Sequence, residues 1–117
     1  MKAVAVHHVS ICVTDLAEAV DFYTRVLGLT LRHDRPASLG PGAWLDAGAQ
    51  QLHLVHADPP PARGQHFAVL VEDLDEAVAE LRAAGLTVSA PVAIGRARQS
   101  FLSDPAGNAV ELHEAAR

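Results

Sequence analysis

The fold of this chain is decided by the stretch HVSICVTDLAEAV (residues 8–20), because the chain carries it again as HFAVLVEDLDEAV (residues 66–78). At an offset of 58 residues, seven of the thirteen aligned positions are identical. The match continues with shifts of one residue: Gly28 aligns with Gly85, AWL (43–45) with SFL (100–102), and QLHL (51–54) with AVEL (109–112). A repeat that stays in register over such a distance indicates two copies of one structural module.

Each copy predicts the element order βαβββ. An alternating apolar stretch at 7–13, and again at 66–71, indicates a strand. Asp15 and Asp73 each precede a glutamate by three residues, which is typical of a helix N-cap. Gly28 and Gly85 stand where a helix ends in a left-handed residue. Further strands are expected at 29–33, 42–47 and 51–56 in the first copy, and at 86–90, 96–103 and 109–113 in the second.

The predicted fold class is α+β, with two tandem βαβββ modules that form an eight-stranded cup-like sheet with the helices on its outer face. We expect one domain over residues 1–117. Module one covers residues 1–57, a proline-rich linker covers 58–64, and module two covers 65–117. Three consecutive prolines in the linker favour a stiff, extended connection.

Composition excludes several classes of protein. The 117 residues are 50% hydrophobic and carry a formal net charge of −5, with only nine lysines and arginines, so nucleic acid is not an expected partner. No apolar run approaches the roughly 20 residues that a membrane-spanning helix needs, and the first residues lack a secretory signal. A single cysteine, Cys12, fits a reducing compartment. We therefore expect a cytoplasmic protein that acts on a small molecule.

Side-chain alternation along the strands predicts a cluster of histidines on one face. The apolar residues of each strand should pack on the helices, which leaves four polar residues at matched repeat positions on the opposite face: His8, His53, His66 and Glu111. Three neutral imidazoles and one carboxylate form a reasonable site for a divalent first-row metal. The alternative is that each histidine is a half-buried polar residue with an ordinary hydrogen-bond partner.

Three motifs make the chain similar to a known family: HHVSICVTDLAEAVDFYTRVLGL (7–29), HFAVLVEDLDEAV (66–78) and FLSDPAGNAVEL (101–112). They resemble the vicinal oxygen chelate superfamily, which includes glyoxalases, fosfomycin-resistance proteins, extradiol dioxygenases, methylmalonyl-CoA epimerases and bleomycin-binding proteins. The resemblance implies a divalent metal (Fe, Ni, Co, Zn or Mn) that binds two neighbouring oxygens of the substrate. It also implies that the ligands are His8, His53, His66 and Glu111.

Departures from the subfamilies leave the reaction open. Glyoxalase I enzymes carry a glutamate where this chain has His53. Their reaction needs carboxylate bases beside the metal, so a single carboxylate, Glu111, argues against it here. His8, His66 and Glu111 are similar to the metal-binding trio of fosfomycin-resistance transferases, but the lysine- and arginine-rich phosphonate contacts of that group are missing. Two histidines and a glutamate also suit a dioxygenase. We expect a lyase or isomerase first and a dioxygenase second, with Glu111 as catalytic residue.

Two other classes of function compete with an enzyme. One is a non-catalytic protein that binds a drug or metabolite in the same cup, as bleomycin-resistance proteins do. The other is a degenerate structural module whose histidines bind no metal. In each case we expect a homodimer, because the two modules expose sheet edges that a partner would cover.

A few residues keep two interpretations. Arg96 and Arg98 either bind an anionic group of the substrate from the cup side or are solvated at an edge. His113 either supports Glu111 or acts as a general acid or base, or else lies at the surface. Residues 33–42 form either a flap over the site or an ordinary loop. Cys12 is interpreted as a small buried residue.

Overall fold

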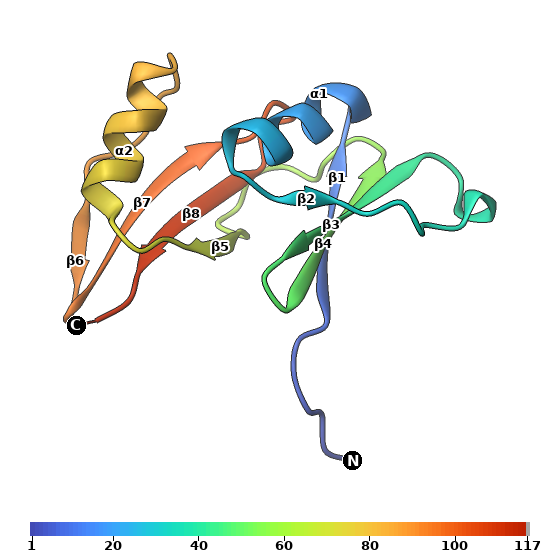
Figure 1. Ribbon diagram of the computed structural model, residues 1–117, viewed down its shortest axis with the longest axis horizontal. Helices are drawn as coiled ribbons and strands as arrows, with labels where there is room; N and C mark the ends of the chain where they lie inside the picture. The colour runs from blue at the N-terminus through green and yellow to red at the C-terminus, as the bar shows by residue number, and fades with distance from the viewer. Residues whose placement is uncertain (117) are drawn as a thin grey trace. The chain divides into compact units, whose positions relative to one another are not determined.

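The computed structural model describes residues 1–116. Its contacts divide the chain into two units, Met1–Pro61 and Ala62–Arg117, and the division falls inside the proline-rich segment 58–64. Each unit contains one four-stranded sheet and one α-helix that packs on it (Figure 1). Among the described residues, no helix is both long enough and apolar enough to cross a membrane.

The first unit follows the predicted order. Its elements are β1 (His8–Val13), α1 (Leu16–Asp21), a π-helical turn (Phe22–Val26), β2 (Thr30–Leu31), a short 3-10 turn (Ala37–Leu39), β3 (Gly42–Ala47) and β4 (Gln50–His56). The strands lie in the order β1-β4-β3-β2. Strand β1 runs parallel to β4, whereas the β2–β3 and β3–β4 pairs are antiparallel.

The second unit repeats this topology. Its elements are β5 (Phe67–Leu70), α2 (Leu74–Ala83), β6 (Val92–Ile94), β7 (Ala97–Ser103) and β8 (Ala109–Glu114), and the strand order is β5-β8-β7-β6. The register repeats as well: Val9 lies opposite Leu52 in the first unit, and Phe67 lies opposite Val110 in the second. Both residues of the second pair are 58 positions after their counterparts. The predicted α+β fold of two βαβββ modules is confirmed, with the eight strands divided between two four-stranded sheets.

The helix boundaries follow the predicted capping residues. Asp15 accepts a hydrogen bond of 3.0 Å from the Glu18 backbone nitrogen, and Asp73 accepts the equivalent bond from Glu76. These bonds satisfy backbone donors that the first helical turn leaves unpaired. At the other end, Gly28 and Gly85 adopt φ values of 77° and 89°. In this left-handed region a side chain would be strained, so both positions favour glycine.

One feature of the first helix is not predicted by its sequence pattern. After Asp21 the backbone widens, and the Leu27 nitrogen donates to the Phe22 carbonyl five residues earlier, at 3.1 Å. The Thr24 hydroxyl donates to the Val20 carbonyl at 2.7 Å, which gives that carbonyl a side-chain partner. The wider turn buries both Phe22 and Tyr23, and their rings meet edge to face.

The helices cover the apolar face of each sheet, as predicted. The buried side chains of the first unit are those of Val13, Ala19, Phe22, Tyr23, Ala43, Leu45, Leu52 and Leu54. The buried apolar side chains of the second unit are those of Leu74, Val78, Leu81, Val88, Leu102, Val110 and Leu112. In both units the central strand that pairs with the parallel edge strand, β4 or β8, contributes alternate residues to this core.

The prediction of a strand at residues 86–90 is wrong. Residues 86–91 are irregular, and β6 begins only at Val92. Within the irregular segment, the Ser89 nitrogen donates to the Phe101 carbonyl and the Ser89 hydroxyl accepts from the Phe101 nitrogen. Because Ser89 uses its side chain for one of these bonds, and Pro91 has no backbone N–H, a regular ladder does not form here.

Candidate metal centre

The four predicted ligands fall into two pairs, one in each unit. On β4 the helix-facing residues Leu52 and Leu54 are buried, whereas His53 between them is half-buried on the opposite face. On β8, Val110 and Leu112 are buried against the helix side, with Glu111 on the opposite face. The alternation predicted from the sequence is therefore correct for both strands.

In the first unit, His8 and His53 stack face to face. Their ring centroids are 3.9 Å apart, with an angle of 14° between the planes. Trp44 stacks on the other side of His53 at 4.7 Å, so three aromatic rings form a column across β1, β4 and β3. The His53 Nε2 atom also lies 2.8 Å from the Gln51 Oε1 atom. Burial, followed by the neighbouring charge of His8, lowers the pKa of His53.

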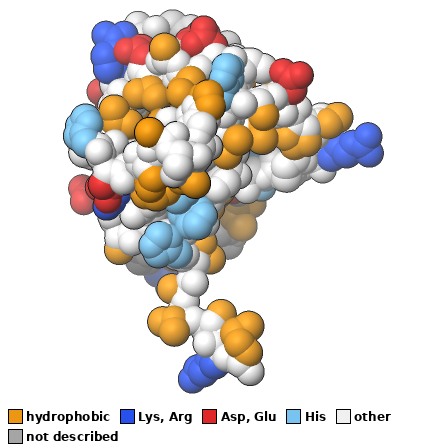
Figure 2. All heavy atoms as spheres, turned by 90° about the vertical axis from the view of Figure 1, so that its right-hand side faces the viewer, with side chains coloured by type: hydrophobic (Ala, Val, Ile, Leu, Met, Phe, Trp, Pro, Cys, Tyr) orange, Lys and Arg blue, Asp and Glu red, His pale blue; other side chains and the backbone are white. Residues whose placement is uncertain are grey.

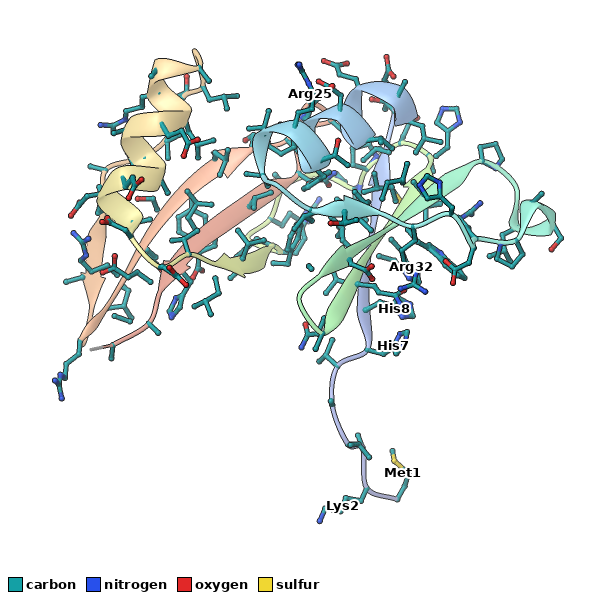
Figure 3. All side chains as sticks on the ribbon, in the orientation of Figure 1. Met1, Lys2, His7, His8, Arg25 and Arg32 are labelled. Atoms are coloured by element: carbon teal, nitrogen blue, oxygen red, sulfur yellow. The ribbon has the colours of Figure 1, made fainter. Side chains whose placement is uncertain are left out.

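His7 is a neighbour of this column that the sequence analysis did not assign to the site. Its Nδ1 atom lies 2.9 Å from the Nδ1 atom of His8, and the two rings meet edge to face. Figure 3 shows both side chains next to each other where the extended N-terminal segment meets β1. Histidine side chains also gather at this place in the space-filling view (Figure 2). The contact occupies His8 Nδ1, so His8 Nε2 is the nitrogen left for a ligand.

In the second unit, the side chains of His66 and Glu111 form a direct hydrogen bond. The His66 Nε2 atom lies 3.0 Å from Glu111 Oε1, and the ring edge contacts Phe101 at a centroid distance of 5.1 Å. His66 Nδ1 donates to the Gly64 carbonyl at 2.8 Å. The hydrogen bond to Gly64, followed by the one to Glu111, raises the pKa of His66. His66 Nδ1 thus has a partner close in sequence, as His8 Nδ1 has in His7, and His66 Nε2 faces Glu111.

His113 completes the surroundings of Glu111. Its Nδ1 atom lies 3.1 Å from Glu111 Oε2, so each carboxylate oxygen has one imidazole partner. Of the interpretations given to His113, the structure shows the contact with Glu111, and the side chain is also 37% exposed at the end of its strand. The signal in the sequence is its spacing, because residues two apart on one strand share a face.

Arg98 does not lie on the predicted cup side. It is the cross-strand partner of Glu114 on β8 and shares the helix-facing side with Ser100 and Leu102. Its guanidinium binds the carboxylates of Glu114 and Asp75 at 3.2 and 3.0 Å, and these bonds raise the pKa of Arg98. The interpretation of Arg98 as a substrate anchor is therefore wrong, because β7 turns this side chain toward the start of α2. Arg96 is exposed before β7 begins.

The loop at residues 33–42 is held by its own arginine. The Arg35 guanidinium donates to the Gly40 carbonyl at 2.5 Å. It also packs so closely on Gly42 that a Cβ atom there would lie 2.5 Å from it. These contacts match a packed connecting loop, the simpler of its two interpretations. Cys12 is half-buried, so it is more exposed than the predicted buried residue.

A hollow of about 430 Å³ lies within the second unit, and neither His66 nor Glu111 belongs to its walls. Its walls are the irregular segment 86–89, residues 101–103 at the end of β7, and Ala109. Phe101 belongs to this wall and also contacts the His66 ring. The volume falls in the range of about 300–1,000 Å³ that is typical of small-molecule sites. The hollow is not predictable from the sequence, because the apolar pattern at 86–90 predicts a strand where the structure has an irregular wall segment.

The donor set of the second unit fits a divalent metal. Two ligand atoms about 2.1 Å from one ion, at a right angle, lie about 3 Å apart, which is the observed separation of His66 Nε2 and Glu111 Oε1. The His8–His53 pair is less well arranged to bind an ion, because His53 Nε2 is hydrogen-bonded to Gln51 and this bond must break before Nε2 can become a ligand. Within either unit taken alone, residues 1–116 include no group of three His, Cys, Asp or Glu side chains arranged to hold a metal.

Comparison with known proteins assigns the chain to a family. The model of the Glyoxalase/Bleomycin resistance protein/Dioxygenase superfamily matches residues 5–112. Glutathione transferase FosA of Serratia marcescens is 31% identical, and the match covers 93% of this chain and 79% of that relative.

Two solved structures are similar over nearly their whole length. A putative glyoxalase family protein from Bacillus anthracis is 27% identical, with 97% of both chains covered and a TM-score of 0.85. TnmS3, an antibiotic binding protein from Streptomyces sp. CB03234, is 29% identical, with 99% of both chains covered and a TM-score of 0.81. With its two βαβββ modules and a family match that spans both, the chain belongs to the Glyoxalase/Bleomycin resistance protein/Dioxygenase superfamily.

Proposed function

We propose that this protein is a metal-dependent enzyme that binds a compact, oxygen-rich substrate by chelation at a divalent ion. His8, His53, His66 and Glu111 supply the ligands. The observation that carries the proposal is the His66–Glu111 pair, whose donor atoms have the 3.0 Å separation that two ligands of one ion need. The ion is Fe, Ni, Co, Zn or Mn.

The roles of the side chains follow from their partners. When bound, a divalent ion supplies Lewis-acid stabilisation of negative charge on the substrate oxygens, which is worth several kcal/mol. His66 keeps its proton on Nδ1, where it donates to Gly64, so that Nε2 offers its lone pair. Glu111, as the carboxylate of the set, is also the proton acceptor that a lyase or isomerase requires.

The donor set leaves more than one reaction class. We favour a lyase or isomerase, in which Glu111 accepts the proton, and a dioxygenase is the second choice. The hollow of about 430 Å³ beside Phe101 has room for the remainder of a compact substrate. Its lining combines apolar side chains with the hydroxyl-bearing Thr87, Ser89 and Ser103, so we expect a substrate with a small apolar part.

We also propose that the protein is a homodimer. Strand β6 is an edge strand of its sheet, and Val92 and Ile94 on it are 55% and 51% exposed. Edge strands with exposed apolar side chains are commonly covered by a partner. Sedimentation equilibrium should give twice the chain mass of 12.3 kDa, and a monomer mass at micromolar concentration would refute the dimer.

A second candidate function is a non-catalytic protein that binds a drug or metabolite. The similarity to the antibiotic binding protein TnmS3 and the hollow in the second unit favour it. The two candidates differ in their use of the metal. In an enzyme of the proposed kind, His66→Ala abolishes both metal and ligand binding, whereas in a binding protein the same change removes the metal and spares the ligand.

The metal content of the untagged protein tests the proposal directly. Plasma mass spectrometry of the purified chain should give near one divalent ion per chain, and His8→Ala and Glu111→Ala should each lose it. Iron would favour a dioxygenase, whereas nickel, cobalt, zinc or manganese would favour a lyase or isomerase. If neither the purified protein nor protein reconstituted with these five metals holds an ion, the enzyme proposal is refuted.

A further inference from the structure

Glu111 is held from both sides by imidazoles that come from different parts of the second unit. His66 lies just before β5, and its Nε2 atom is hydrogen-bonded to Glu111 Oε1 at 3.0 Å. His113 lies two residues after Glu111 on β8, and its Nδ1 atom is hydrogen-bonded to Glu111 Oε2 at 3.1 Å. The Glu111 side chain is only 12% exposed, while that of His113 is 37% exposed. The carboxylate is thus held at both oxygens, and its two imidazole partners are exposed to a similar degree.

We propose that His113 is a positioning residue that fixes Glu111 as a single-oxygen ligand. The inference rests on the proposed metal-dependent function. Because His113 Nδ1 donates to Oε2, that oxygen is turned away from the ion, and Oε1 remains beside His66 Nε2. A carboxylate oriented in this way binds a metal without first losing rotational freedom, and hydrogen bonds to ligating groups commonly contribute 10- to 100-fold to metal affinity.

The repeat provides an internal comparison. Glu111 corresponds to His53 in the first module, and His113 corresponds to Val55, since both positions are 58 residues apart. Val55 is an exposed apolar residue beside an imidazole. An imidazole ligand has its own second nitrogen for orientation and needs no donor at the neighbouring position. The donor therefore occurs in the module where the ligand is a carboxylate, as the proposal requires.

Two substitutions separate positioning from simple packing. The amide nitrogen of asparagine takes nearly the place of a histidine Nδ1 atom, and that of glutamine takes the place of Nε2. His113→Asn therefore keeps a donor to Glu111 Oε2, whereas His113→Gln and His113→Ala do not. The matched control is His33→Ala, because His33 is an exposed histidine of the first unit.

The measurement is calorimetric titration of the metal-free full chain with Mn²⁺ and with Ni²⁺, together with thermal unfolding of each metal-free variant. We expect affinity 10- to 100-fold weaker for His113→Ala and His113→Gln, nearly wild-type affinity for His113→Asn and His33→Ala, and little change in melting temperature. Wild-type affinity in His113→Ala would overturn the inference and leave the proposed function standing.

Two further results also decide the matter. If all three His113 variants bind the ions equally weakly and melt at lower temperature, His113 is only a packing residue and the inference is wrong. If the wild-type chain binds neither ion, and reconstitution with the other metals also fails, the proposed function fails first. The inference then loses the ion that it requires.

Discussion

The start of α2 offers a direct test of how a buried carboxylate holds this fold together. Glu114, at the end of β8, accepts a 2.7 Å hydrogen bond from the Leu74 backbone nitrogen and also binds Arg98. Its side chain is 11% exposed. Asp75 binds the same guanidinium at 3.0 Å, but its side chain is 72% exposed. One arginine thus has a buried and an exposed partner, which makes a matched pair of substitutions.

The two carboxylates should differ several-fold in their contribution to stability. Removal of Glu114 takes a charge-assisted hydrogen bond, worth about 1.5–3 kcal/mol, from a backbone N–H at the buried end of the helix. Breaking a buried ion pair costs about 3–5 kcal/mol, but Arg98 keeps Asp75 as a partner, so the lower end applies. We expect Glu114→Ala to lower the free energy of unfolding by about 3 kcal/mol. Asp75→Ala removes an exposed ion pair and should cost about 1 kcal/mol or less.

Urea unfolding of the metal-free protein, followed by circular dichroism, measures both changes. Glu114→Ala should shift the midpoint clearly to lower urea, with Asp75→Ala close to the wild type and an unchanged slope for both. Metal affinity should stay unchanged in Asp75→Ala, since Arg98 lies on the helix side of the sheet. Equal losses of stability in the two variants would refute the argument that burial of Glu114 decides its contribution.

Three further outcomes follow from the site and the helix ends. His53→Ala should weaken Ni²⁺ binding less than His66→Ala does in calorimetry, because His53 Nε2 is already bonded to Gln51 and His66 stands ready beside Glu111; the reverse order would contradict this. Because the folded state raises the pKa of His66, its contribution to the stability of the metal-free protein is fully present below the ordinary histidine pKa of about 6.5 and is lost as pH rises through the raised value. Unfolding curves of the wild type and His66→Gln should accordingly converge as pH rises above this range. Gly85→Ala should lower the free energy of unfolding by about 1 kcal/mol, because φ is 89° there, and an unchanged urea midpoint would count against a strained left-handed residue.

The sequence predicts those features that depend on local chemistry and on the repeat. Asp15 and Asp73 were identified as helix caps because a short acidic side chain three residues before a glutamate suits that position. The side-chain alternation that puts His53 and Glu111 opposite the helices follows from strand geometry alone. These predictions need only neighbouring residues, and the structure confirms each of them.

Features that depend on strand register are not predictable in the same way. The sequence leaves the side of Arg98 open between the cup and an edge, because a shift of one residue exchanges the two sides of a strand, and the pairing of Arg98 with Glu114 fixes the side. The position of β6 was wrong because residues 86–90 have an apolar pattern, while Ser89 and Pro91 direct the backbone bonds elsewhere. The sequence predicts that His113 shares a face with Glu111, but the hydrogen bond between the two side chains is seen only in the structure.

The comparison of the two modules explains how one fold supplies two kinds of ligand. The register is the same in both, so His53 and Glu111 occupy equivalent places on β4 and β8, each opposite an aromatic residue on the neighbouring strand. The chemistry of the two places has diverged. In the first module His53 lies in a stack of rings, and in the second Glu111 is a carboxylate with two imidazole partners. Among the four candidate ligands, the one carboxylate and its negative charge therefore belong to the second module, and the first module offers imidazoles alone.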